Sequence, residues 1–135
     1  MASYGMKIKV RGSLDEVKAR VVEALTTQGF GVLTEIDMQK ALKQKIGVDF
    51  KPYLILGACN PHFAYRALSA DEEIGLLLPC NVVLKQENGG VEVSIQDPEV
   101  MFSVVDEETK ASMAGFPQEV KRSLLSVLEA LKNAG

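Results

Sequence analysis

The stretch YLILGACNP, residues 53–61, carries the signals of a strand and of a helix start side by side. Residues 53–58 are apolar without alternation, which predicts a strand in the middle of a sheet that is covered on both faces. Asn60 is a favoured N-cap and Pro61 a favoured first helical residue, so a helix is expected over residues 61–69. The fold is therefore expected to contain a buried strand that runs directly into a helix, with a cysteine at the junction.

The sequence before this junction alternates between strand and helix patterns. Two strands with alternating apolar residues are expected, each followed by a helix: residues 6–10, 13–28, 30–36 and 37–46. Ser13 and Glu16 have the spacing of a capping box, and Gly29 closes the first helix. Asp37 opens the second, shorter helix.

After the junction the pattern is mainly that of antiparallel strands. Strand-like segments are expected over residues 74–78 and 82–85, joined across a bend at Pro79, because proline cannot donate to a central ladder. Residues 88–90, Asn-Gly-Gly, predict a hairpin turn into an alternating strand over residues 91–95. A final helix starting at Pro117 has one apolar stripe, formed by Val120, Leu124, Val127, Leu128 and Leu131. This order predicts an α+β fold of two layers, with a mainly antiparallel sheet and helices on one face.

Length and composition limit the classes of protein. The 135 residues predict one domain over residues 1–135, and 47% hydrophobic with 24% charged residues is typical of an ordinary globular protein. A net charge of −3 with dispersed cations argues against a nucleic-acid surface. The apolar runs are too short to span a membrane, and residues 1–10 lack a secretory signal. We therefore expect a cytoplasmic protein with neither nucleic acid nor membrane as its partner.

The two cysteines, Cys59 and Cys80, are too few for a disulfide framework. Cys59 directly precedes the expected N-cap, where backbone amides and the helix dipole stabilise a thiolate or an anion. Oxidation of Cys59 with Cys80, or a thiol relay between them, requires only that the two strand ends are neighbours. The competing interpretation is that both cysteines are ordinary core thiols.

A second hypothesis for this corner is a metal site. Cys59 and His62 have two residues between them, a spacing at which a thiolate and an imidazole can hold one ion, and Cys80 or a carboxylate could complete the set. One such pair is a weak signal, because structural zinc sites usually show two paired motifs. The alternative is an ordinary histidine at the solvent edge of the helix.

Two carboxylates end the second expected strand. Glu35 and Asp37 are two residues apart on an extended chain, so both point to one side, where they could act as an acid and base pair or hold a hard cation. Asp37 is also well placed as an N-cap, and this structural role is favoured.

Four ordered motifs resemble the prokaryotic domain-of-unknown-function family 302 over residues 6–131. They are GVLTEID at 31–37, YLILGACNP at 53–61, IGLLLPC at 74–80, and Asp97-Pro98. The resemblance implies a two-layer α+β domain, similar to TATA-binding-protein-like folds, that forms homodimers, but it implies no reaction. The motif positions here are Glu35, Asp37, Gly57, Cys59, Asn60, Pro61, Pro79, Cys80, Asp97 and Pro98. His62 lies just outside the motif.

Two functional hypotheses follow. The first is a homodimer with a thiol-centred redox, metal or small-ligand site around Cys59 and Cys80, with Asn60, His62, Glu35 and Asp37 as further candidate site residues. The alternative is a non-catalytic binding or dimerisation module with an apolar cavity and buried, inert thiols. Whether the protein is an enzyme, and with which cofactor or small-molecule ligand, stays open at this stage.

Overall fold

The computed structural model describes residues 3–134, which contain one five-stranded antiparallel sheet in the order β1-β5-β4-β3-β2. The strands are β1 (Gly5–Val10), β2 (Gly31–Asp37), β3 (Tyr53–Cys59), β4 (Cys80–Glu87) and β5 (Gly90–Gln96). Strands β4 and β5 form the predicted hairpin, in which Glu87 faces Gly90. The expected α+β class is confirmed, as is the mainly antiparallel sheet.

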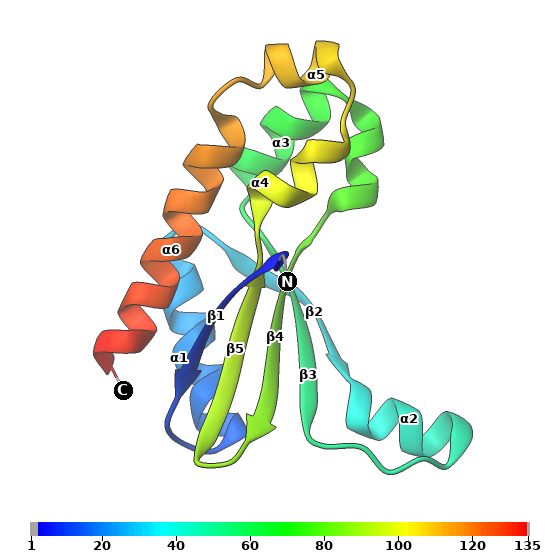
Figure 1. The fold of residues 1–135 in the computed structure, drawn as a ribbon, viewed down its shortest axis with the longest axis vertical. Helices are drawn as coiled ribbons and strands as arrows, with labels where there is room; N and C mark the ends of the chain where they lie inside the picture. Colours follow the sequence, from blue (N-terminus) through cyan, green and yellow to red (C-terminus); the bar gives the residue numbers. More distant parts are fainter. Residues whose placement is uncertain (1–2, 135) are drawn as a thin grey trace.

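Two long helices, α1 (Leu14–Thr27) and α6 (Phe116–Ala134), pack against each other and cover one face of the sheet (Figure 1). The core lies between these helices and the sheet, with Val17 and Val21 on α1, Leu124 on α6 and Val93 on β5 fully buried. The predicted apolar stripe of the last helix is therefore the face that meets the sheet. The opposite face of the sheet carries no long helix among residues 3–134, and we call it the open face.

The remaining helices lie at the two ends of the sheet. Helix α3 (Pro61–Ala70), the 3-10 helix η1 (Glu72–Leu77), α4 (Pro98–Met101), the 3-10 turn η2 (Phe102–Val104) and α5 (Glu107–Ser112) cap the end where β3 finishes. Helix α2 (Met38–Ile46) projects from the other end (Figure 1). None of the helices in the described part of the chain is long and apolar enough to cross a membrane.

The predicted helix starts are confirmed in atomic detail. Ser13 and Glu16 form the reciprocal capping box of α1. Asp37 caps α2 by accepting a hydrogen bond from the Lys40 amide at 2.9 Å. Asn60 caps α3, with Pro61 as its first residue. Short-range hydrogen bonding fixes these boundaries, so the sequence alone could locate them.

The expectation that residues 53–58 form a central strand covered on both faces was wrong. The central strand is β4, and β3 lies second from the edge. Leu54, Leu56 and Ala58 of β3 face the helices and are buried, whereas Tyr53 and Ile55 lie on the open face and are half-buried. The missing alternation therefore reflects apolar residues on the open face and not a second layer of helices.

The expected strand over residues 74–78 was also wrong, because residues 72–77 form η1. Asp71 starts this 3-10 helix by accepting a hydrogen bond from the Glu73 amide at 3.0 Å. Ile74 is buried in it, whereas Leu76 is exposed. A short apolar run does not distinguish a strand from a helical turn, and here the local cap decided the outcome. The bend at Pro79 is present, and the Leu78–Pro79 peptide is cis.

Candidate functional site

The structure brings Cys59 and Cys80 to the same end of the sheet. Cys80 begins β4 directly opposite Ala58 of β3, so Cys59 is the next residue along the neighbouring strand. With a strand spacing of about 4.8 Å and a rise of about 3.3 Å per residue, this offset places the two Cα atoms about 6 Å apart. That separation lies within the range of disulfides. Both residues are half-buried free thiols.

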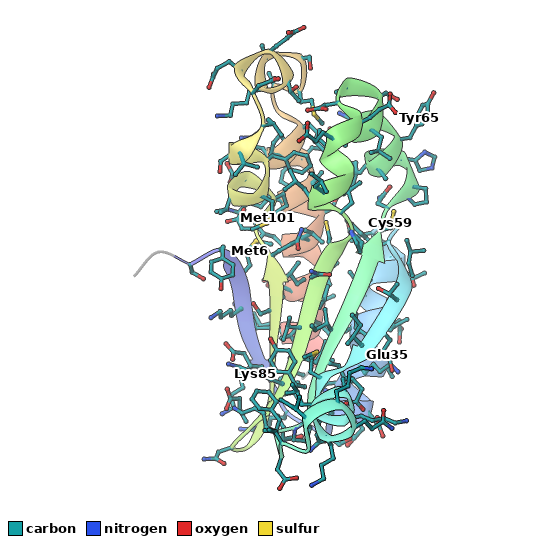
Figure 2. The ribbon with its side chains drawn as sticks, turned by 90° about the vertical axis from the view of Figure 1, so that its right-hand side faces the viewer. Met6, Glu35, Cys59, Tyr65, Lys85 and Met101 are labelled. Carbon is teal, nitrogen blue, oxygen red and sulfur yellow. The ribbon has the colours of Figure 1, made fainter. Side chains whose placement is uncertain are left out.

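Both cysteines line one apolar cavity of about 30 Å³ beneath α3. In a regular strand, consecutive side chains point to opposite faces, so Cys59 and Cys80 would be separated by the sheet. Both residues nevertheless line the cavity, at the point where β3 gives way to the N-cap of α3. Figure 2 shows Cys59 at this end of β3. Both cysteines therefore border one small apolar space.

Aromatic rings form the far wall of this cavity. Phe63 of α3 and Phe102 of η2 each meet the ring of Phe116 edge-on, with centroids 5.8 and 5.5 Å away. Phe30 completes the group, 6.1 Å from Phe63. The space holds about one water molecule, far less than the roughly 300 Å³ of a typical small-molecule pocket. At this size the cavity does not hold an organic ligand.

The environment of Cys80 suppresses its ionisation. Burial raises the pKa of the Cys80 thiol to about 11, and a negative charge on Cys59 adds to this effect. At neutral pH Cys80 is therefore a protonated thiol, whereas Cys59 directly precedes the N-cap of α3, next to the N-terminal end of the helix dipole.

Asn60 has a structural role at this junction. Its Oδ1 atom accepts hydrogen bonds from the amides of His62 and Phe63, at 3.0 and 3.2 Å. Its Nδ2 atom donates to the carbonyl oxygen of Gln28 at 3.1 Å, which ties the start of α3 to the end of α1. All polar atoms of the side-chain amide are thus used within the fold. Asn60 fixes the position of Cys59 and is not itself directed at a ligand.

The residues considered for a metal site do not converge. His62 lies exposed in the first turn of α3 and does not line the cavity that both cysteines share. Within residues 3–134, no three His, Cys, Asp or Glu side chains are grouped so that they could hold a metal ion. The structure therefore brings the two cysteines together and leaves the histidine apart from them.

Glu35 and Asp37 lie toward the other end of the sheet, away from Cys59 (Figure 2). A bulge between Val32 and Thr34 turns the Glu35 side of β2 toward α1, where Glu35 forms an ion pair with Lys18. Asp37 is occupied as the cap of α2. Neither carboxylate joins the thiols, and each already has a partner of its own.

Gly57 is a site residue whose role the sequence did not explain. A Cβ atom at this position would collide with Thr34 Oγ1 and lie 2.9 Å from Pro79 Cγ. The absence of a side chain at Gly57 therefore lets Thr34 of the edge strand β2 and Pro79 pack directly against the open-face side of β3. The only signal in the sequence was a glycine within a strand, which often marks a close approach of this kind.

Asp97, at the end of β5, holds the helical cap to the sheet. One carboxylate oxygen accepts from the Glu99 amide at the start of α4, and the other lies 2.9 Å from Lys121 Nζ of α6. Its own amide donates to the carbonyl oxygen of Tyr4. The Asp97-Pro98 motif thus joins three elements beside the cavity wall, and its role is structural.

The fold and the site define a two-layer α+β domain with a pair of cysteines at the junction of its sheet and helical cap. The sequence model of the family described as domain of unknown function DUF302 matches residues 6–131, and the chain belongs to this family. The chain is also similar to the crystal structure of an uncharacterized conserved DUF302 protein from Bacillus stearothermophilus, with 30% identity and a TM-score of 0.83. That match covers 96% of this chain and 99% of the other. The comparison with curated proteins found no match.

Proposed function

We propose that the protein is a dithiol domain in which Cys59 and Cys80 exchange with small disulfides. The observation that carries this proposal is that two cysteines from adjacent strands, about one residue out of register, line one apolar cavity. We expect the chain to work in a reducing cytoplasm, where both cysteines are thiols in the ground state and are oxidised only transiently.

The reaction proceeds in two exchange steps. The Cys59 thiolate attacks one sulfur of a small disulfide such as glutathione disulfide and expels one glutathione thiolate, leaving a mixed disulfide. Cys80 then gives its proton to solvent and attacks the Cys59 sulfur, which releases the second glutathione. The two cysteines lose two protons and two electrons, and the small disulfide becomes two thiols.

The different surroundings of the two cysteines support this order. Cys59 directly precedes the N-cap of α3, whereas the raised pKa of Cys80 keeps that residue protonated until the first step is complete. Formation of the mixed disulfide also removes the Cys59 charge that raises the Cys80 pKa. The first step therefore prepares the second.

The experiment uses single serine variants and glutathione disulfide under native conditions. We expect Cys80→Ser to stop at a stable mixed disulfide on Cys59 and Cys59→Ser to react much more slowly. The wild-type protein should instead end with an internal disulfide and no adduct. Equal rates for the two variants, or labelling of both cysteines only after unfolding, would show that the thiols are inert core residues.

A second candidate function, a homodimerisation module, is favoured by the open face of the sheet. Ile36, Ile55 and Val83 lie side by side in one row across β2, β3 and β4. Ile36 is 46% exposed, and no element of the described chain covers this row. An apolar row on an uncovered sheet face is a typical protein contact surface.

Sedimentation of a charged variant tests the homodimer. We expect Ile36→Glu to convert a wild-type dimer into a monomer. Leu125→Glu is the matched control, because Leu125 is 45% exposed but lies on α6 behind the sheet. A monomeric wild-type protein, or an equal effect of both substitutions, would reject the open face as the dimer interface.

A further inference from the structure

Helix α2 is a projecting arm that contacts mainly β2, β3 and the loop after it among the described residues, with Met38, Ala41 and Leu42 half-buried there. None of its nine residues is buried, and Ile46 in its last turn is 67% exposed. The arm is held in place by its Asp37 cap and by a hydrogen bond of 2.9 Å from Gln39 Nε2 to the Phe50 carbonyl oxygen. A helix this short depends on packing for its stability, and the exposed Ile46 leaves the last turn of its apolar side uncovered.

The arm is strongly basic. Helix α2 and the loop after it, residues 38–51, contain four lysines and one acidic residue. Lys43 is paired with that residue, Asp49, at 2.8 Å. Lys40 and Lys45 form no ion pair with any residue from 3 to 134. The arm thus presents two unpaired cations beside an exposed isoleucine.

The opposite end of the molecule is acidic and carries exposed apolar residues, so it is complementary to the basic arm. Six carboxylates gather on η1 and on the start of α5, with only Lys110 as a cation in the same segments: Asp71, Glu72, Glu73, Asp106, Glu107 and Glu108. Three of them, Asp71, Glu73 and Asp106, line a hollow of about 280 Å³. Its apolar lining includes two of the most exposed aliphatic residues among those described, Leu76 at 80% and Val104 at 74%. We call this region the acidic hollow.

We propose that the α2 arm of one copy docks in the acidic hollow of a second copy. Ile46 lies against Leu76 and Val104, while Lys40 and Lys45 face the carboxylates at the rim. The charges match, and the hollow is large enough for a branched aliphatic side chain. This inference rests on the proposed homodimer and specifies how its two copies are oriented.

The position of the two surfaces fits a symmetric dimer. Figure 1 shows α2 and the green-to-yellow turn of η1 on the same side of the sheet, at opposite ends of the molecule. A twofold axis through the open face reverses the second copy, so each arm meets the other copy's hollow and the contact forms twice. The apolar row of Ile36, Ile55 and Val83 then lies at the centre of the interface.

The test is a charge-reversal cycle followed by analytical ultracentrifugation at low salt. Lys40→Glu with Lys45→Glu should raise the dimer dissociation constant about tenfold or more, because four favourable pairings become repulsive in the symmetric dimer. Glu72→Lys with Glu73→Lys should do the same. All four substitutions together in one chain should restore the affinity toward the wild-type value, and circular dichroism checks the fold of each variant.

The matched control reverses two cations on the covered side of the molecule. Arg122→Glu with Lys132→Glu on α6 changes the net charge by the same amount and should leave the dissociation constant within about twofold of wild type. A wild-type chain that is monomeric at all concentrations rejects the homodimer itself. A dimer that survives the reversals, or that the combined variant fails to restore, rejects only the docking of the arm.

One further outcome would assign the arm to another surface. If Lys40→Glu with Lys45→Glu leaves the dimer intact but abolishes binding to vesicles of phosphatidylserine and phosphatidylcholine, the cations serve an anionic lipid surface. That result overturns the docking on a second copy.

Discussion

Cys59 and Cys80 lie on adjacent antiparallel strands, one residue out of register, at the edge of a single apolar cavity. The register brings the backbones together, and the turn into α3 places Cys59 at the lining of the cavity that Cys80 also borders. The two thiols are not equivalent, since burial holds Cys80 in its protonated form. This asymmetry is the basis of the proposed order of exchange.

The second exchange step should depend strongly on pH. Because the Cys80 pKa is raised to about 11, its thiolate fraction increases about tenfold for each pH unit below that value. We expect the mixed disulfide on Cys59 to accumulate near pH 7 and to resolve progressively faster up to pH 10. Quenched-flow alkylation with mass spectrometry measures the lifetime of the adduct. A resolution rate that is flat between pH 7 and 10 would contradict the assignment of Cys80 as the resolving thiol.

Cys80 should also make the folded state less stable at high pH. An unfolded cysteine ionises near its ordinary pKa of 9.0, whereas the folded residue stays neutral up to about 11. The unfolded state therefore loses its proton first, and the contribution present below pH 9 is lost as the pH rises to 11. We expect the free energy of unfolding to fall by about 2 kcal/mol more in the wild type than in Cys80→Ala across this window. Urea unfolding at each pH provides the comparison, and parallel curves for the two proteins would count against the buried thiol.

Gly57→Ala adds only one methyl group, but we expect it to lower the free energy of unfolding strongly. The added methyl group meets Thr34 and Pro79 on the open-face side of β3, and overpacking of this kind costs about 1–3 kcal/mol. Gly31→Ala is the matched control, because no atom lies within 4 Å of a Cβ at that position. Equilibrium denaturation of both variants tests the difference. Equal stabilities would mean that β2 and Pro79 do not close over β3 as described.

Asn60→Ala should cost more stability than Asp37→Ala, although both remove a helix cap. Loss of the α3 cap costs about 1 kcal/mol, and loss of the bond to the Gln28 carbonyl oxygen about as much again. Asp37 caps only the exposed arm α2, so its removal should cost less than about 1 kcal/mol. Denaturant unfolding distinguishes the two, and a larger loss for Asp37→Ala would contradict the structural role of Asn60.

Features that depend on neighbouring residues in the sequence could be predicted. The capping box at Ser13 and Glu16, the caps at Asp37 and Asn60 and the turn between β4 and β5 all follow from short-range hydrogen bonding and backbone preference. The stripe on α6 follows from helical periodicity. These signals were sufficient for the order of most elements and for the α+β class.

Features set by contacts between distant segments could not be predicted in the same way. The place of β3 in the sheet depends on which strands pair, and an apolar strand has the same sequence pattern whether helices or a second copy cover it. The sequence GVLTEID does not predict the bulge in β2, yet this bulge turns the Glu35 side chain toward α1. The sequence suggested Cys59 and Cys80 as partners, but only the register between β3 and β4 places them together, and only the cavity reveals the aromatic wall.

The most direct test of the central claim is the equilibrium oxidation of the native wild-type protein in glutathione buffers of graded ratio. After an acid quench and alkylation, mass spectrometry gives the fraction of molecules that have lost two hydrogen atoms without gaining an adduct. The account predicts one reversible two-electron transition to an internal Cys59–Cys80 disulfide, within the roughly −270 to −120 mV range of biological dithiols. A protein that keeps both thiols reduced at every ratio, and reacts only once unfolded, would contradict it.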